Sequence, residues 1–360
     1  MRRGLIGLIL LAVVAVVAVV LTQTNLGSVL QRGAALAPVK VAIYYGGEKQ
    51  ALLAEPAVQK ILTDRYAITL DATKAGSVEM VTRLDTSAKD CLWPSNELAV
   101  ELAKESGKSV LAEDTIFNSP IVLYAWADVA AALQKAGVVT DRAGILVADT
   151  AKLGGLIHDG KRWKEDLGLD LYGPFRVIST DPAKSNSGNI WAALLATALN
   201  NGQAPTEADA LRLAPEVAAY FASLGFMESS SGDLFANFLK QGMGARPLIV
   251  GYENQLVEFV VANQNYAQLI RDKIKVIYPE PTIFASHPLI SLTPICKRLV
   301  TALTDPELQK LAWTQHGFRT GLIGIDNKPS DVAAITLPET VQQVVPMPSA
   351  ATMRALVALQ

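Results

Sequence analysis

Residues 39–47 read VKVAIYYGG, in which seven residues rich in types that favour a β-strand are followed by two glycines that end it. The next residues, 48–63, place apolar side chains at helical spacing. The same alternation returns along the chain, with strands expected over 67–72, 89–93, 121–126, 175–179, 248–250 and 274–278, and helices over 77–84, 96–105, 128–136, 189–200, 253–262 and 305–316. Repeated strand–helix units of this size predict an α/β fold with a largely parallel sheet and helices on both faces.

The length and composition of the chain favour two globular lobes. The 360 residues are enough for two large cores, half of them are hydrophobic, and the formal net charge is only −2. Lysine and arginine are scattered among acidic residues along the whole sequence, so no basic patch for a phosphate backbone is present. This balance argues against a disordered chain and against a nucleic-acid binder.

The N-terminus predicts a single-pass anchor in the cytoplasmic (inner) membrane. Arg2 and Arg3 precede an unbroken apolar run over residues 4–21, which reaches the lower end of the length that spans a membrane as a helix. The arginines favour the cytoplasmic side, so the rest of the chain should lie in the periplasm or outside the cell. The alternative is a cleaved secretory signal, but such signals usually have a shorter apolar core, and the candidate small-residue site at 35–37 lies far downstream. No cysteine follows the run to carry a lipid, and residues 22–37 are expected to be a polar tether.

The sequence contains two cysteines, Cys91 and Cys296. In an oxidising compartment they could form one disulfide bond. Each also lies among apolar residues, which is typical of a buried free thiol that packs as a small hydrophobic side chain. The sequence alone leaves both alternatives open.

No sequence pattern of a known catalytic site is present. The chain lacks HExxH, G-x-S-x-G, S-x-x-K, a Walker loop and G-x-G-x-x-G. Its histidines, His158, His287 and His316, lie in unrelated contexts without ligand spacing, so we expect surface or packing roles for them. The two cysteines offer no zinc site. The expectation is therefore a protein that is not an enzyme and that uses no cofactor or metal.

Small polar residues gather where the expected strands end and helices begin. Such loops occur at residues 46–49, 76–77, 94–96, 118–120 and 180–189. In open α/β sheets, ligands bind outside the carboxyl ends of the strands, and the free N–H groups of a helix start accept an anionic or polar group. The ordinary alternative for each loop is helix capping, which needs no ligand. Convergence of several loops on one sheet edge would favour binding.

The order of these segments resembles that of type 2 periplasmic solute-binding proteins, in the branch of molybdate- and sulfate-type binders of ABC importers. Residues 39–49 resemble the opening strand and first ligand loop, and residues 74–77 the loop that follows. Further similarities lie in NSPIVL at 118–123 (a crossing strand), in 179–188 (a second-lobe loop and helix start), in GYENQ at 251–255 (a turn with a ligand contact), in the return strand at 278–292, and in the "-PE-Q-…-GF" helix at 305–318.

The resemblance covers residues 39–324 and implies two α/β lobes joined by a hinge of two crossing strands, with a ligand in the cleft. It implies a first lobe at 38–120 plus 285–345 and a second lobe at 121–284. The N-terminal anchor and tether expected at 1–37 and the C-terminal tail at 346–360 depart from the family's pattern. The tail is expected to form a short helix over 349–359. The first loop departs from the pattern because it carries Glu48 and Lys49, which either point away from the cleft or indicate a ligand other than a simple oxyanion.

The resulting prediction is a tethered extracytoplasmic solute-binding protein that captures a small polar or anionic ligand and presents it to an ABC permease or a sensor in the membrane. The residues expected to line the cleft are Gly47, Glu48, Lys49, Ser77, Ser95, Ser119, Ser185, Ser187, Gly188, Tyr252 and Glu253. The serines and backbone N–H groups would hold acceptor atoms, and Tyr252 would close over the ligand. The alternative is a ligand-free interaction or scaffold protein of the cell envelope with the same fold.

Overall fold

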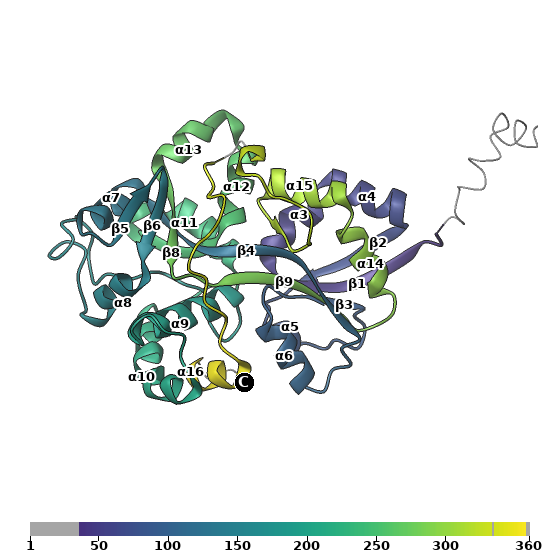
Figure 1. The fold of residues 1–360 in the computed structure, drawn as a ribbon, viewed down its shortest axis with the longest axis horizontal. Coiled ribbons are helices and arrows are strands. Elements are labelled where there is room, and N and C mark those ends of the chain that lie inside the picture. Colours follow the sequence, from purple (N-terminus) through teal and green to yellow (C-terminus); the bar gives the residue numbers. More distant parts are fainter. Residues whose placement is uncertain (1–35, 333–334, 358–360) are drawn as a thin grey trace, which may run out of the picture. The chain divides into compact units, whose positions relative to one another are not determined.

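The computed structural model describes residues 36–332 and 335–357, and the chain from Val39 onward forms one compact unit (Figure 1). The predicted membrane anchor at 4–21 and nearly all of the predicted tether lie outside the described residues. Within the described ranges, no helix combines the length and the apolar character needed to cross a membrane.

The strands of the described unit form two sheets that share one long strand, β4 (Ala112–Trp126). The order along the main path is β2-β1-β3-β9-β4-β8-β6-β5, and β10 and β7 pair with β4 beside it. The first sheet contains β1 (Val39–Tyr45), β2 (Ile68–Lys74), β3 (Cys91–Trp93), β9 (Phe284–Ser291) and β10 (Arg319–Thr320). The second contains β5 (Val139–Arg142), β6 (Ile145–Asp149), β7 (Leu248–Tyr252) and β8 (Ile274–Glu280). We call the elements built on these two sheets the first lobe and the second lobe.

The sheets are mixed, so the expectation of a largely parallel sheet is wrong. β1 runs parallel to β2 and β3, and β6 runs parallel to β8, but every pair that includes β4 is antiparallel. The reason is that the chain passes out of the first lobe along β4 and back into it along β9, in the opposite direction. Hydrophobic periodicity reports that a strand exists and carries no information on its direction.

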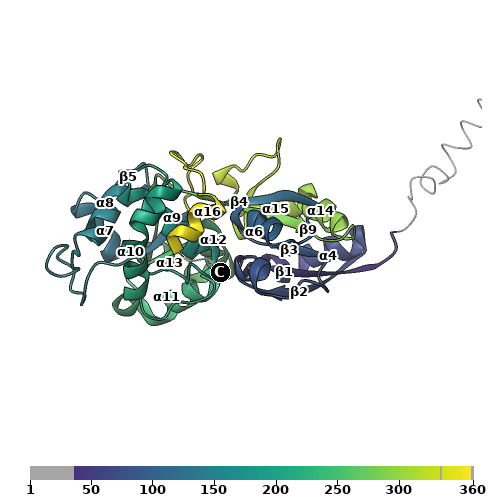
Figure 2. The same cartoon turned by 90° about the horizontal axis from the view of Figure 1, so that it is seen from below.

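Helices cover the sheets of both lobes (Figures 1 and 2). In the first lobe they are η1 (Gly47–Lys49), α3 (Gln50–Ala54), α4 (Pro56–Tyr66), α5 (Glu79–Thr82), α6 (Leu98–Glu105), α14 (Cys296–Leu303) and α15 (Pro306–His316). In the second lobe they are α7 (Ala127–Lys135), α8 (Thr150–His158), α9 (Asn186–Leu199), α10 (Glu207–Ser223), α11 (Ser231–Ala245), α12 (Glu253–Ala262), η2 (Gln264–Tyr266) and α13 (Ala267–Lys273). The C-terminal segment adds η3 (Pro329–Asp331) and α16 (Ala350–Val357).

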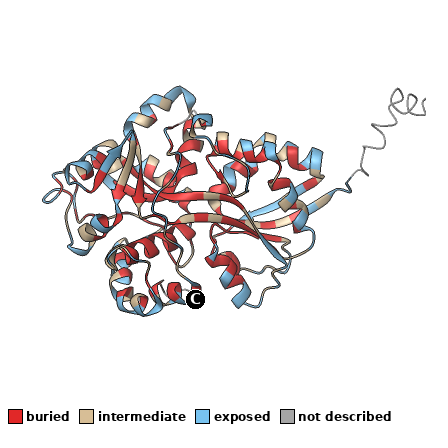
Figure 3. Ribbon diagram, viewed as in Figure 1, coloured by how far each residue is buried: buried red, intermediate tan, exposed pale blue. Residues whose placement is uncertain are grey.

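The chain crosses between the lobes along β4 and again between β8 and β9. The residues of β4 from Ile116 to Ala125, except Asn118, are buried, so the crossing runs through the interior (Figure 3). A continuous cluster of buried apolar side chains includes residues of α5 and α6 from the first lobe together with residues of α7, α9 and α10 from the second. The apolar interior is therefore continuous from one lobe to the other in this conformation.

Two of the expected elements differ in form. Residues 175–179 do not form a strand, because only Ile178 makes an isolated bridge, to Ile249. The helix expected over 48–63 is broken at Glu55, and α4 begins at Pro56, the first helical position that proline favours. Local apolar character predicted both segments. The available strand partners limit the first segment, and Pro56 sets the start of the helix in the second.

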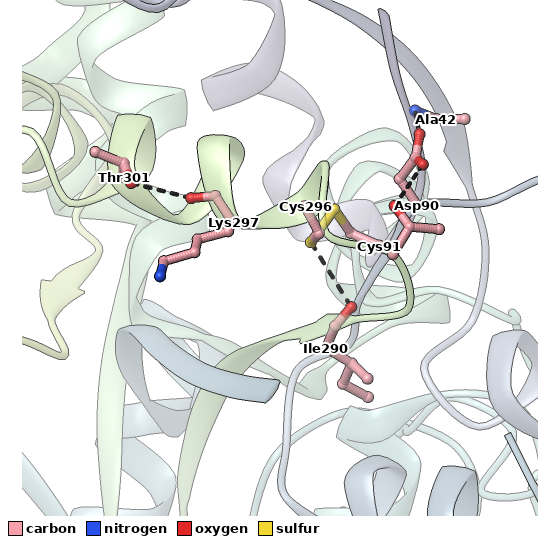
Figure 4. Close-up of a disulfide and its surroundings, with 8 residues drawn as sticks. Ala42, Asp90, Cys91, Ile290, Cys296, Lys297 and Thr301 are labelled. Atoms are coloured by element: carbon pink, nitrogen blue, oxygen red, sulfur yellow. Dashed lines mark hydrogen bonds between the residues drawn. A yellow bond between two sulfur atoms is a disulfide. The ribbon is translucent and has the colours of Figure 1, made fainter. Parts of the chain in front are cut away.

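Cys91 and Cys296 form a disulfide bond, which resolves the alternative that the sequence left open (Figure 4). Cys91 begins β3 and Cys296 begins α14, and both are fully buried in the first lobe. The neighbouring Asp90 accepts hydrogen bonds from the Ala42 N–H at 2.9 Å and the Thr293 hydroxyl at 2.7 Å. The bridge thus joins the two chain segments of the first lobe, which are separated in sequence by the second lobe.

Replacing both cysteines by alanine should lower the free energy of unfolding by roughly 2–5 kcal/mol, because a bridge between distant residues restricts the unfolded chain. The bridged residues are 205 positions apart in sequence. Urea denaturation under non-reducing conditions measures the change, and the native protein in reductant should approach the variant. Equal midpoints for the variant and the oxidised native protein would show that the thiols are not paired.

Candidate functional site

Polar loops from both lobes meet around a small cavity of about 10 Å³, which is room for about one water molecule. The first lobe contributes the turn after β1 and the turn after β2, and the second lobe contributes the starts of α9 and α11 and the end of β7. The lining residues are Gly46, Gly47, Glu48, Ala75, Gly76, Ser77, Ser185, Asn186, Ser229, Ser230, Ser231 and Tyr252. The cavity therefore lies at the carboxyl ends of β1 and β2, where ligands of open α/β sheets bind.

Backbone pairing of the parallel strands aligns the two first-lobe turns. The Gly46 N–H donates to the Trp93 carbonyl at 3.1 Å, and the Ala75 N–H donates to the Tyr45 carbonyl at 3.0 Å. Gly76 allows the second lobe to approach, since a Cβ atom there would lie 2.4 Å from the Lys184 carbonyl oxygen. A side chain at this position would force the lobes apart.

Three helices of the second lobe begin at the cavity: Ser185 is the N-cap of α9, Ser230 of α11 and Tyr252 of α12. The first-turn N–H groups of a helix have no partner within the helix and carry a partial positive charge. Ser230 accepts from the Asp233 N–H at 3.2 Å, whereas the side chain of Ser185 makes no capping bond to α9. The Ser185 hydroxyl is instead 3.2 Å from the Ser187 hydroxyl. The second-lobe wall of the cavity is thus built from helix starts and hydroxyl groups.

Hydrogen bonds between the lobes surround the cavity. The Asn186 amide donates to the Ser95 carbonyl of the first lobe at 2.9 Å, and the Asn186 side chain is paired with that of Asn96. Within the second lobe, the same amide donates to the Tyr252 hydroxyl at 2.9 Å. Farther around the rim, the Asn254 amide donates to the Glu48 carbonyl at 3.3 Å, and Lys74 pairs with Asp233 at 3.1 Å. The described conformation is therefore a closed one.

Glu48 and Lys49, the two charged residues of the first loop, form a buried ion pair. Glu48 lines the cavity and is 7% exposed, and Lys49 behind it is fully buried. The Lys49 ammonium also donates to the Pro94 carbonyl at 3.2 Å and to the Ser95 hydroxyl at 3.1 Å. The Ser95 hydroxyl in turn donates to Glu48. The carboxylate at the cavity is thus matched by a cation.

The pair shifts the ionisation of its members and of His287. Burial acts to raise the pKa of Glu48, but the Lys49 charge and the His287 ring together hold that pKa well below its usual range. Burial lowers the pKa of Lys49, and the Glu48 carboxylate opposes this shift. Burial, reinforced by the Lys49 charge, lowers the pKa of His287 to about 4. At neutral pH the cluster therefore contains an ion pair and a neutral imidazole.

The structure brings together many of the predicted site residues. Gly47, Glu48, Ser77, Ser185 and Tyr252 line the cavity. Ser95 and Lys49 lie directly behind them, since the Ser95 N–H donates to the Ser77 hydroxyl at 3.1 Å. Ser187 does not line the cavity; its hydroxyl is hydrogen-bonded to the Ser185 hydroxyl and, at 2.7 Å, to the Thr180 hydroxyl.

Besides Lys49, Ser95 and Ser187, three more predicted site residues do not line the cavity: Ser119, Gly188 and Glu253. Ser119 is buried in β4, and its hydroxyl has no hydrogen-bond partner among the described residues. Gly188 packs so closely on the preceding loop that a Cβ atom would lie 2.5 Å from the Thr180 carbonyl oxygen. Glu253 accepts from Arg319 at 2.7 and 2.9 Å and from the Tyr278 hydroxyl at 2.7 Å. These contacts give Gly188 and Glu253 roles in holding the fold.

The residues that sequence reasoning missed come chiefly from the start of α11. Ser229, Ser230 and Ser231 line the cavity, as do Gly46, Ala75, Gly76 and Asn186. The signal was available, because residues 228–232 read ESSSG, a serine-rich helix start like those that were singled out. A group of three or more histidine, cysteine, aspartate or glutamate side chains placed to hold a metal ion does not occur among the described residues.

No protein-family model and no curated protein sequence matches this chain. Solved structures do match. The sulfate-binding protein SubI from Mycobacterium tuberculosis H37Rv has a TM-score of 0.52 and 15% sequence identity over 89% of this chain and 98% of that chain. The ferric binding protein from Campylobacter jejuni has a TM-score of 0.56 and 11% identity over 88% of this chain and 96% of that chain. Iron-bound HitA from Pseudomonas aeruginosa has a TM-score of 0.55 and 12% identity over 89% of this chain and 99% of that chain.

These similarities establish the fold. The chain has the two-lobed α/β fold of the type 2 periplasmic solute-binding proteins, and the resemblance predicted from the order of sequence segments is confirmed. At these levels of identity the similarity does not transfer a ligand.

The free energy of unfolding should fall by about 2–3 kcal/mol between pH 6.5 and 4.5, because the pKa of His287 is lower in the folded protein than in the unfolded chain. The unfolded chain protonates this histidine near pH 6.5 and the folded chain only near pH 4, so acid favours the unfolded state between these values. Urea denaturation across this range should give a shallower slope for His287→Gln than for the native protein. The slope is the readout, because the substitution also changes packing.

The matched control is His158→Gln. His158 is exposed, and its hydrogen bond to Glu216 raises its pKa, so its contribution is lost as pH rises and has the opposite sign. This variant should keep the acid-side slope of the native protein. An unchanged slope in His287→Gln would mean that the imidazole is not held neutral in the folded state.

Proposed function

We propose that this protein is an extracytoplasmic solute-binding protein that captures a small anion in the cavity between its lobes. The observation that carries the proposal is the start of three helices at one serine-lined cavity. Helix starts and hydroxyl groups supply hydrogen-bond donors and a positive potential without a formal charge. Such an arrangement suits an oxyanion or a small carboxylate.

The cavity is small in the closed conformation. At about 10 Å³ it has room for about one water molecule, so a bound anion would require the lobes to close less tightly around it. Sulfate is the ligand named for SubI, one of the proteins with the same fold, and a small oxyanion is a ligand that the hydrogen-bond donors around this cavity suit. The Glu48 carboxylate does not repel such an ion strongly, because Lys49 neutralises it from behind.

The proposal also places the protein at the outer side of the cytoplasmic membrane. The apolar run at 4–21, preceded by Arg2 and Arg3, would anchor the chain there and leave the lobes outside. A buried disulfide suits an oxidising compartment. A membrane transporter of the ABC type, or a sensor, would then receive the ligand or the ligand-closed lobes. Binding and presentation require no catalytic step.

A thermal-shift screen of the purified protein against sulfate, phosphate, molybdate and small carboxylates tests the proposal. One anion class should raise the melting temperature by about 4 °C at 100 times its Kd, since it binds only the folded state. Tyr252→Phe, which removes a cavity hydroxyl, should weaken binding about tenfold. Tyr266→Phe is the matched control, because Tyr266 is 63% exposed and does not line the cavity.

A second pair of variants tests whether binding needs the closed conformation. Gly76→Ala should weaken ligand binding strongly, because its Cβ would meet the Lys184 carbonyl at 2.4 Å when the lobes close. Gly155→Ala in α8 is the control, since nothing lies within 4 Å of the added methyl group. No stabilisation by any anion class would instead favour the ligand-free interaction protein, and equal affinity in Gly76→Ala would place the ligand elsewhere.

A further inference from the structure

The C-terminal segment crosses from the first lobe back to the second. After β10 in the first lobe, Val332, Ile335 and Leu337 are buried in an apolar cluster with side chains of β7, β8, α11 and α12. Arg319 in β10 holds the C-terminal segment to the first lobe, because its guanidinium donates a hydrogen bond to the Pro338 carbonyl at 2.9 Å. The segment then runs across the connection between the lobes to α16 (Figures 1 and 2). It is thus a third crossing in addition to β4 and the β8–β9 connection.

The segment is hydrogen-bonded to one of the two other crossings. Thr282, which lies between β8 and β9, donates its N–H to the Gln343 carbonyl at 3.0 Å and accepts from the Val345 N–H at 2.8 Å. The Thr282 hydroxyl also donates to the Ile121 carbonyl in β4 at 3.3 Å. The C-terminal segment is therefore held at the hinge by backbone bonds on both sides of Val344.

Beyond the hinge, α16 contacts both lobes. Its buried face, Ala350, Met353 and Leu356, joins the apolar cluster that includes α9 and α10 of the second lobe. On the other side it meets α6 of the first lobe. There the Ala350 N–H donates to the Glu101 carboxylate at 2.8 Å, and Arg354 forms an ion pair with Glu105.

The contacts with α6 are electrostatically matched. Glu101 and Glu105 are four residues apart on α6, so their side chains lie on one face of that helix. Glu101 faces the N-terminus of α16, where a negative charge is favourable, and Glu105 faces the Arg354 cation. Opening of the lobes would separate α6 from α16 and break both contacts, whereas the apolar contacts of α16 with α10 would move with the second lobe.

We infer that residues 338–357 form an interlobe strap, which holds the two lobes closed in the absence of a ligand. The strap is bonded at the hinge, packed on the second lobe and paired by charge with the first lobe, so it favours the closed conformation over the open one. A ligand that binds the closed form gains affinity in proportion to the fraction of molecules already closed. The strap thereby sets both the resting conformation and the affinity of the cleft.

The distance between the lobes in the ligand-free protein tests the strap directly. Spin labels on cysteines introduced at Lys60 in α4 and Lys135 in α7 report this distance by pulsed electron paramagnetic resonance, because both positions are exposed and the native cysteines are paired. Arg354→Glu should lower the ratio of closed to open molecules about fivefold, since it replaces an ion pair by a third negative charge beside Glu101 and Glu105. The charge-swapped pair Arg354→Glu with Glu105→Arg should restore the native distribution.

Arg212→Glu is the matched control. Arg212 pairs with Asp209 within α10, so reversing its charge perturbs the second lobe alone and should leave the distance unchanged. Circular dichroism of each variant verifies folding. The same distance distribution in Arg354→Glu and in the native protein, or failure of the charge swap to restore it, would overturn the inference. No ligand enters the experiment, so its outcome is independent of whether the cleft binds an anion.

Discussion

β4 is the constraint on which the rest of the structure depends, because it belongs to both sheets. Its first part pairs with β9 as far as Pro120 and its second part pairs with β7 from Ile121 onward. Buried backbone groups must stay paired, so neither sheet can detach from this strand. The change of partners falls at a proline, which has no N–H to donate. A bend between Pro120 and Ile121 therefore costs fewer ladder bonds than a bend elsewhere in β4.

The shared strand also explains why charge can be buried at the cleft. Because β4 and β9 fix the two lobes edge to edge, the turn after β1 is enclosed when they meet, and any charge on it loses its water. Glu48 and Lys49 are tolerated there because they neutralise each other and because Ser95 and the Pro94 carbonyl satisfy their remaining bonds. With the two formal charges balanced, neutral donors dominate the remaining cavity wall. Selectivity would then rest on hydrogen-bond geometry and size.

Sequence reasoning succeeded where the signals are local. The strand Val39–Tyr45 and helix α15 were predicted and are confirmed; Asp305 caps that helix by accepting from the Glu307 N–H at 2.8 Å, and Gly317 ends it with φ +69°. It failed where partners are distant. No residue near Glu48 in the sequence indicates that His287 lies 3.4 Å from its carboxylate. Likewise, no feature of residues 175–179 indicates that only one of them pairs with a strand. Strand direction and register depend on pairing across the chain, whereas the serine-rich start of α11 was a local signal that was overlooked.

The disulfide has a consequence for how the protein responds to force. Cys91 and Cys296 are 205 positions apart, and the entire second lobe lies in the loop that they close. A pull applied between the two ends of the chain is transmitted through the sulfur atoms and bypasses everything between them. Once the C-terminal segment has been pulled off the second lobe, the covalent path would bypass that lobe, and the contour length released on stretching the oxidised protein would be limited to the residues outside the loop. Force on the two ends of the oxidised chain would thus leave the covalent loop that contains the second lobe unstretched.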